Sequence, residues 1–347
     1  MSPCKKISYI SLLIGLLFQR NPLLNAQENT LTHYFSASSY DNPASAGDTR
    51  FIQVGFINRI QPLTSTSPVY NTLLTYDQKL RNHRSGIGFT INQKVSGFKE
   101  LQIKLNYSHS WTIFTHFGMK GGLGFSWNFL NSHASSYFYP DQYDRFGITG
   151  EPTHEWKLEE YENYPAFAAG MIMYNEFGWL SVAGDYLNRP RQEFAGKHTN
   201  VPISWSIHGG YLFQLDKYQR PRRIINPKGG LEPYSSIGPV AGFHKQGPFY
   251  SYNFGINAFL HPVFAGISYR KFNFSGENIL QGVSSLNLLL GYRNEKLSVA
   301  YSYDAMISRT ATNYQGAHEI SVIIYLYTIR EDYRKNTLIP FPNQLMY

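Results

Sequence analysis

A serine, a histidine and an acidic residue near the C-terminus are the residues of this chain whose types could carry hydrolytic chemistry. Ser302 and Ser308 precede His318, and Glu319 follows it directly. A hydrolase needs its nucleophile within reach of a base, and a third group that orients the base. This spacing does not require Ser302 and His318 to project from one face of a strand, and no second acid–base set is present. We therefore expect no enzyme and no catalytic residue.

The other potential ligands and nucleophiles do not form a site either. The eleven histidines are scattered, without the H-x-x-H or H-E-x-x-H spacing of metal sites. The single cysteine, Cys4, stands before the apolar core of a secretory-type leader, so we expect a mature chain without thiols. A glycine-rich phosphate loop is absent from the sequence. The expected cofactors and metals are therefore none.

Alternation of apolar and polar residues is the dominant pattern between about positions 50 and 327. Within 296–304, Leu297, Val299, Tyr301 and Tyr303 alternate with small or polar residues. Successive side chains of a strand point to opposite faces, so such a strand has one apolar and one polar face. A tilted strand of about ten residues crosses a bilayer. The pattern therefore indicates membrane-spanning strands.

We predict an all-β fold, a transmembrane antiparallel β-barrel of about 14 strands over 50–328 with both termini periplasmic. Lys104, Asp185 and Arg270 fall on the polar face, as expected, because Lys or Arg facing lipid costs about 2–4 kcal/mol at mid-bilayer. The expected strands are 50–60, 68–80, 84–95, 98–113, 117–129, 164–175, 178–188, 201–214, 233–245, 249–260, 262–272, 279–293, 295–307 and 317–328.

Composition agrees with a membrane barrel. Aromatic residues make up 16% of the 347 residues and charged residues 16%, against roughly 25% charged residues in a soluble domain. The mean hydropathy of -0.33 fits a barrel, because its lumen is polar. The net charge of +8 is expected to lie in loops and lumen beside anionic outer-membrane lipid, and not to bind nucleic acid.

The ends of the chain are expected to lie outside the barrel. Lys5 and Lys6, the apolar stretch 7–18 and Ala26 have the features of a secretory signal over 1–26. We expect 27–49 to form a periplasmic N-terminal segment and 329–347 a periplasmic tail.

Short connections alternate with long ones along the predicted strands, as in outer-membrane barrels with short periplasmic turns. Segment 216–231 breaks this rule, because it is long and basic yet falls on the periplasmic side. Either a strand is misplaced there, or the segment is a docking loop. Its candidate docking residues are Lys217, Arg220, Arg222, Arg223 and Lys228.

Two groups of motifs together resemble one known family. Near the N-terminus stands Asp41-Asn42-Pro43-Ala44-Ser45-Ala46-Gly47, followed by Arg59-Ile60-Gln61; near the C-terminus stand Tyr301-Ser302-Tyr303-Asp304 and Gly316-Ala317-His318-Glu319-Ile320. With Gly86-Ile87-Gly88-Phe89 and Val95-Ser96-Gly97, these resemble the PorP/SprF family of type IX secretion system membrane proteins from Bacteroidetes-type bacteria. The family commonly has Trp after Arg-x-Gln, where this chain has Pro62.

The resemblance covers about 30–330 and implies an outer-membrane barrel of the type IX secretion and gliding machinery. It implies two kinds of partner. One is a secreted surface protein with a type IX C-terminal sorting domain, and the other is periplasmic or outer-membrane machinery of the same system. The basic segment is not part of the family motifs, so the resemblance assigns it no role.

The motif residues also have physical interpretations. Asn42 and Pro43 favour a turn and Gly47 permits a tight bend, so we favour a plug or a turn leading into the first strand over a partner contact. Tyr301 and Tyr303 are expected to face lipid or to join an aromatic girdle. Asp304 and His318 are expected close enough for a charge-assisted bond that locks barrel closure, in preference to a ligand contact.

Two functions remain open from the sequence. The first is a docking barrel that binds protein through the outer loops 131–163, 189–200 and 308–316, or through the basic segment and tail. The second is a pore or transporter for small molecules. Fourteen strands can leave a lumen, but the 29 glycines and many tyrosines can also fill it.

Overall fold

The computed structural model describes residues 31–32, 37–48, 52–62, 68–80, 84–96, 98–114, 117–132, 143–144, 147–148, 161–175, 177–194, 197–215, 235–274, 283–294, 296–308 and 316–326. The predicted signal at 1–26, the basic segment 216–231 and the tail 329–347 lie outside these residues. No helix within the described ranges has the length and apolar character needed to cross a membrane.

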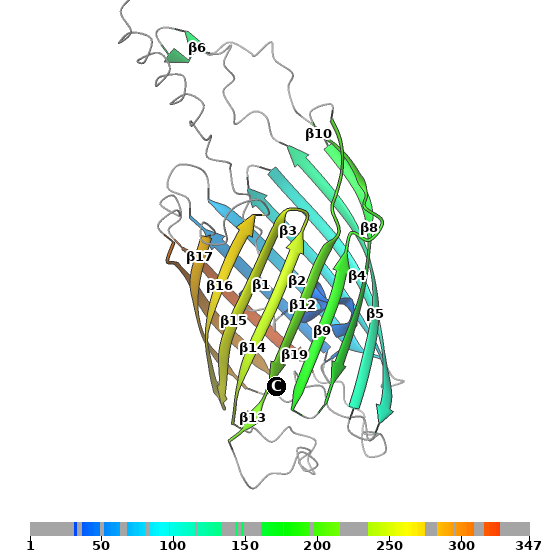
Figure 1. Ribbon diagram of the computed structural model, residues 1–347, viewed down its shortest axis with the longest axis vertical. Helices are drawn as coiled ribbons and strands as arrows, with labels where there is room; N and C mark the ends of the chain where they lie inside the picture. Colours follow the sequence, from blue (N-terminus) through cyan, green and yellow to red (C-terminus); the bar gives the residue numbers. More distant parts are fainter. Residues whose placement is uncertain are drawn as a thin grey trace, which may run out of the picture. The chain divides into compact units, whose positions relative to one another are not determined.

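Fourteen antiparallel strands form a closed β-barrel (Figure 1). Closure is made by two pairs of strands: the first and last strands pair from Ile52↔Leu326 to Ile60↔His318, and β12 pairs with β14. The strands are β1 (Ile52–Gln61), β2 (Val69–Lys79), β3 (Ser85–Ser96), β4 (Phe98–Phe114), β5 (Phe117–Ser132), β8 (Tyr161–Tyr174), β9 (Gly178–Asp185), β12 (Ser204–Tyr211), β14 (Ser236–Gln246), β15 (Phe249–Leu260), β16 (Val263–Phe274), β17 (Val283–Arg293), β18 (Leu297–Met306) and β19 (Ala317–Leu326).

The predicted antiparallel β-barrel and all fourteen expected strands are confirmed, with differences at the strand ends. β8 begins three residues earlier than expected, and β9 stops at Asp185. The expected strand 201–214 is divided into β12 and the two-residue β13 (Phe213–Gln214), which also pairs with β14. Short strands form in two long connections, β6 (Tyr143–Asp144) with β7 (Gly147–Ile148), and β10 (Arg191–Phe194) with β11 (Lys197–Asn200). These hairpins were not expected from the sequence.

The two faces of the wall differ as the alternation predicts. Apolar side chains cover the outside, where Leu105 is 55% and Leu123 68% exposed. Their sequence neighbours, such as Lys104 and Gly124, are buried on the inside. A polar inner face needs internal partners, and these come from the wall itself and from the N-terminal residues.

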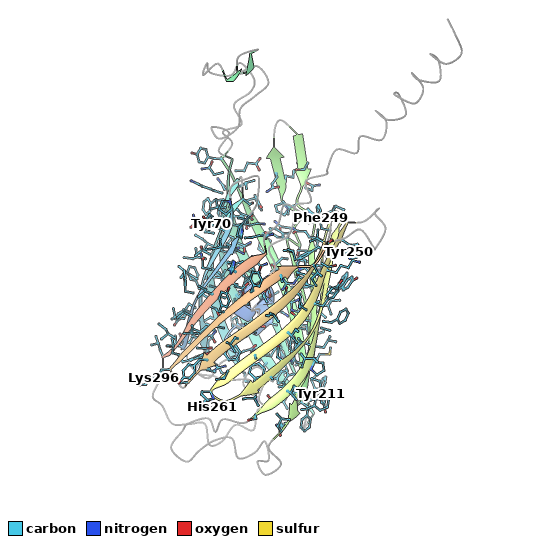
Figure 2. The ribbon with its side chains drawn as sticks, turned by 90° about the vertical axis from the view of Figure 1, so that its left-hand side faces the viewer. Tyr70, Tyr211, Phe249, Tyr250, His261 and Lys296 are labelled. Carbon is cyan, nitrogen blue, oxygen red and sulfur yellow. The ribbon has the colours of Figure 1, made fainter. Side chains whose placement is uncertain are left out.

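The barrel has two different ends. Figure 2 labels Tyr211, His261 and Lys296 at one end, which we call the short-turn end, and Tyr70, Phe249 and Tyr250 at the other, the long-loop end. The connections after β5 and β9 lie at the long-loop end. The short-turn end has the brief connections after β4, β8, β15 and β17.

N-terminal residues lie inside the barrel (dark blue in Figure 1). They include α2 (Ser38–Asp41) and the 3-10 turn η2 (Pro43–Ser45). We use the word plug for residues 31–32 and 37–48. Residues 27–49 were expected to form a periplasmic segment; the described part of that range contacts the inner wall of the barrel.

Candidate functional site

The plug is anchored at its centre by Asn42. The Asn42 side-chain amide donates to Ser181 Oγ at 2.7 Å, with longer contacts to the carbonyl oxygens of Val182 and Met171. Its own Oδ1 accepts the backbone N–H of Ala44 at 2.8 Å, which caps the turn that Pro43 begins. One side chain therefore both shapes the plug and fastens it to β8 and β9.

Gly47 and Asp48 hold the plug near the short-turn end. Gly47 has a φ of +64°, a conformation that glycine adopts without strain, and its Cα lies against Gly86. Asp48 forms a buried ion pair with Lys120 on β5, three residues from the start of that strand. The motif glycine is thus required by both backbone conformation and close packing.

The face of β4 that lines the lumen supplies hydrogen-bond donors to the plug backbone. Lys104 Nζ donates to Tyr40 O at 2.9 Å, Asn106 Nδ2 to Ser39 O at 2.7 Å, and Ser108 Oγ to Ala46 O at 2.6 Å. These three wall residues are spaced by two, so the strand period places them on the same face. Lys104 also forms an ion pair with Asp185 of β9 at 2.8 Å.

A second set of contacts holds residues 31–32 near the long-loop end. We call Thr32, Arg59, Arg270, Asp304 and Glu319 the seam cluster. Arg59 donates to Asp304 at 2.6 Å and to Glu319 at 3.2 Å, and all three side chains are at most 3% exposed. Thr32 Oγ1 donates to Asp304 at 2.7 Å, and the Thr32 backbone N–H donates to Glu319 at 2.9 Å.

Arg270 extends the seam cluster to β16. Its guanidinium contacts Asp304 at 3.5 Å and donates to Leu31 O at 3.2 Å. The cluster therefore combines two guanidinium and two carboxylate groups from four wall strands around the start of the plug. Buried charges are tolerated only when paired and hydrogen-bonded, and this arrangement meets that condition.

The structure corrects the expected bond between Asp304 and His318. Asp304 is buried in the lumen, whereas His318 is exposed on the outer face, where its Nδ1 lies 2.7 Å from Tyr301 Oη. The expectation was wrong because His318 lies opposite Tyr303 in the register, and Asp304 lies opposite Ala317. The contacts that join the closing strands instead come from Arg59, Asp304 and Glu319.

The Ser–His set considered for hydrolysis is likewise divided between the two faces. Ser302 is 1% exposed on the inside, its Oγ has no hydrogen-bond partner among the described residues, and it lies opposite Glu319. His318 is on the outside, so it cannot serve as the base of Ser302. Within the described ranges, no group of three His, Cys, Asp or Glu residues is placed to hold a metal ion.

The other predicted residues take varied positions. Tyr301 is 45% exposed on the outer face, as expected, and the ring centroid of Tyr303 lies 4.9 Å from that of His318. Gly316 has a φ of +94° before β19. Ala44 is fully buried against the wall. The docking candidates Lys217, Arg220, Arg222, Arg223 and Lys228 lie outside the described residues.

Sequence reasoning missed Thr32, Lys120 and the pairing roles of Lys104 and Arg270. The signal available was that Lys104 and Arg270 stand on the polar face of apolar strands, which requires an internal counter-charge. The identity of each partner depends on barrel closure and on the position of the plug, and neither is encoded in local spacing.

Asp41 is the plug residue whose ionisation responds most clearly to this environment. Burial inside the barrel raises the pKa of Asp41 from about 3.8 to about 6, partly offset by the nearby cationic groups of His244 and Lys104.

Comparison with known proteins gives one family and several barrels. The type IX secretion system membrane protein PorP/SprF family matches residues 23–324. No curated protein matches the chain.

Three solved structures illustrate the similar barrels. The CymD monoaromatic hydrocarbon channel is 8% identical, with a TM-score of 0.47 over 85% of this chain and 94% of its own. The Ralstonia pickettii toluene transporter TbuX is 9% identical, with a TM-score of 0.47 over 84% and 94%. The KdgM porin is 8% identical, with a TM-score of 0.36 over 79% and 99%. At these values the likeness supports no inference about function.

The family match extends over the plug, the seam cluster and nearly all of the barrel. It places the barrel in the outer membrane. The chain therefore belongs to the PorP/SprF family and is an outer-membrane component of the type IX secretion system.

Proposed function

We propose that this barrel is a docking protein: it binds or anchors a secreted surface protein that carries a type IX C-terminal sorting domain, and it docks periplasmic components of the same machinery. The observation that supports docking over transport is the plug. A lumen that holds part of its own chain through buried polar contacts is poorly suited to pass solutes.

The plug contacts support this argument at both ends of the lumen. Thr32 is held near the long-loop end by Asp304 and Glu319, each two residues from the end of its strand. Asp48 is held near the short-turn end by Lys120. Removing the plug would leave the Lys120 ammonium group without Asp48, and would take the Thr32 donors from Asp304 and Glu319. A closed, rigid cylinder is therefore the expected resting state, and its loops are the parts available to partners.

The outer connections are the proposed surface for the secreted protein. Within the expected loops 131–163, 189–200 and 308–316, the structure describes the β6–β7 and β10–β11 hairpins, and in the second Arg191 pairs with Asn200. Arg191 and Asn200 are exposed, and the hairpin is drawn beyond the barrel rim in Figure 1. The basic segment 216–231 and the tail 329–347 are the proposed contacts for periplasmic machinery.

A pull-down from detergent-solubilised outer membranes tests this proposal. The tagged full chain should retain a secreted protein, and replacement of 191–200 by a Gly-Ser sequence of equal length should reduce its recovery several-fold. Lys296→Ser, at the opposite end of the barrel (Figure 2), is the matched control. Recovery of no secreted protein by the unmodified chain would contradict docking.

A further inference from the structure

We propose that the lumenal surface of β3, β4, β5, β8 and β9 is a peptide-binding site, which the chain's own residues 37–48 occupy, and that it accepts a peptide from a partner in their place. We call this surface the plug groove. Its ligand would be a short peptide with small side chains around an Asn-Pro turn and a carboxylate six residues after the asparagine. The inference rests on the proposed function in one respect, because the docked secreted protein is taken as the source of that peptide.

The groove binds the backbone carbonyl oxygens of its occupant. Lys104, Asn106 and Ser108 all donate to plug carbonyl oxygens, and Lys120 adds a contact of 3.3 Å to Ala46 O. Every peptide carries these acceptors. The donors would therefore serve another chain in the same conformation without any change in the wall.

Glycines in the wall restrict the size of the occupant. A Cβ placed at Gly122 would overlap the backbone of Pro43 and Ala44, and one at Gly86 would overlap Ala46. A Cβ at Gly170 would meet the Asn42 side-chain amide. Ala44 and Ala46 are fully buried in this close approach, so only small residues fit at these two positions.

Two side chains of the occupant are recognised specifically. The Asn42 amide reaches Ser181 and two wall carbonyl oxygens, and its own oxygen caps the following turn. Asp48 meets the Lys120 ammonium group, and both side chains are at most 6% exposed. A ligand lacking the amide or the carboxylate would leave buried groups of the wall without partners.

The plug leaves some buried polar atoms of the groove without a hydrogen bond. Asn106 Oδ1 and Thr90 Oγ1 are buried with no hydrogen-bond partner in the described part of the chain. Each such atom weakens the bound state of the plug relative to its solvated state. The covalent link to β1 compensates, because it gives the plug a high effective concentration. A partner held by the outer loops would gain the same advantage, which makes exchange feasible.

A binding measurement on the full chain tests the proposal. The probe is a fluorescent synthetic peptide with the sequence of 37–48. The chain carries Cys4→Ser, with Ala44→Arg and Ala46→Arg to displace its own plug without altering the wall. Heat-modifiable migration on gels shows that the barrel is folded. An added Ser39→Cys thiol, buried in the unmodified chain, reports departure of the plug through its reaction with maleimide.

We expect the displaced chain to bind the peptide. Two matched changes should each weaken binding at least tenfold: Gly122→Ala in the wall, and Asn42→Ala in the peptide. Gly121→Ala, on the outer face of the same strand, should leave it unchanged. Absence of binding, or equal binding by the Gly122→Ala chain, would overturn the proposal. Continued protection of the introduced thiol would also overturn the proposal. It would mean that the plug stays docked with arginine at 44 and 46, so that the groove does not select small residues. Since no secreted protein is used, this result is separable from the pull-down.

Discussion

Arg59 and Asp304 form a buried ion pair across the closing seam of the barrel, with 2.6 Å between Nη2 and Oδ2. Arg59 belongs to the first strand and Asp304 to the strand before the last, so the pair passes over β19 and takes Glu319 as its third member. Thr32 of the plug bonds to both carboxylates. Barrel closure and plug docking therefore share one set of charges.

Arg59→Met should strongly destabilise the barrel. It leaves the carboxylates of Asp304 and Glu319 buried without their main counter-charge, and loss of one member of a buried pair typically costs about 3–5 kcal/mol. Arg59→Lys should fall between Met and the unmodified chain, because a lysine ammonium cannot make two fork-like contacts. Urea unfolding in lipid vesicles measures the change. Lys296→Met, at an exposed turn, is the control, and an equal effect of both Met variants would contradict the cluster's role.

His318→Ala should have a small effect on stability. The substitution removes one hydrogen bond to Tyr301 Oη on the outer face. The net contribution of such a bond to the free energy of unfolding is about 1 kcal/mol or less. The same urea experiment measures it. The register places His318 opposite Tyr303 and so excludes the bond to Asp304 that was expected from the sequence. A loss of stability as large as that of Arg59→Met would contradict this position of His318.

The strands could be predicted because alternation is a local property. Leu101 to Ser108 alternates without a break, and β4 forms there as expected. The position of His318 relative to Asp304 could not be predicted in the same way. A one-residue difference in register moves a side chain to the other face, and local sequence does not specify register across a long connection.

The plug was only partly predictable. The turn at Asn42 and the bend at Gly47 follow from residue types, and a plug was one of the interpretations favoured for them. Its partners Ser181 and Lys120 are over 70 residues away in sequence, so only the closed barrel brings them together. The basic segment around Arg222 remains a prediction.

Docking of the plug should weaken as pH rises. The pKa of Asp41 is about 6 in the barrel and near 3.8 when the plug is free in water, so the docked state binds the extra proton between these values. The contribution of Asp41 to the free energy of plug docking is therefore most favourable below about pH 4, and it declines as pH rises through about 6. Hydrogen exchange of residues 37–48, corrected for intrinsic rates, should show less protection at pH 7 than at pH 5. Asp41→Asn should reduce that difference, and an unchanged difference would contradict the assignment.

Replacement of Arg220, Arg222 and Arg223 by Ser should reduce co-purification of periplasmic machinery several-fold. The physical reason is the loss of three guanidinium groups that can pair with carboxylates of a partner. The triple Arg→Lys variant keeps the charge and is the matched control. The barrel should remain heat-modifiable on gels in both variants. Full recovery of the machinery with the Ser variant would count against a docking role for 216–231.

Conductance of the unmodified protein in planar bilayers tests the central claim most directly, namely that the chain's own N-terminal residues fill the lumen. The plug contacts predict no sustained current at moderate voltage, and current only after a substitution such as Gly122→Ala displaces the plug. A steady open channel in the unmodified protein would contradict the claim.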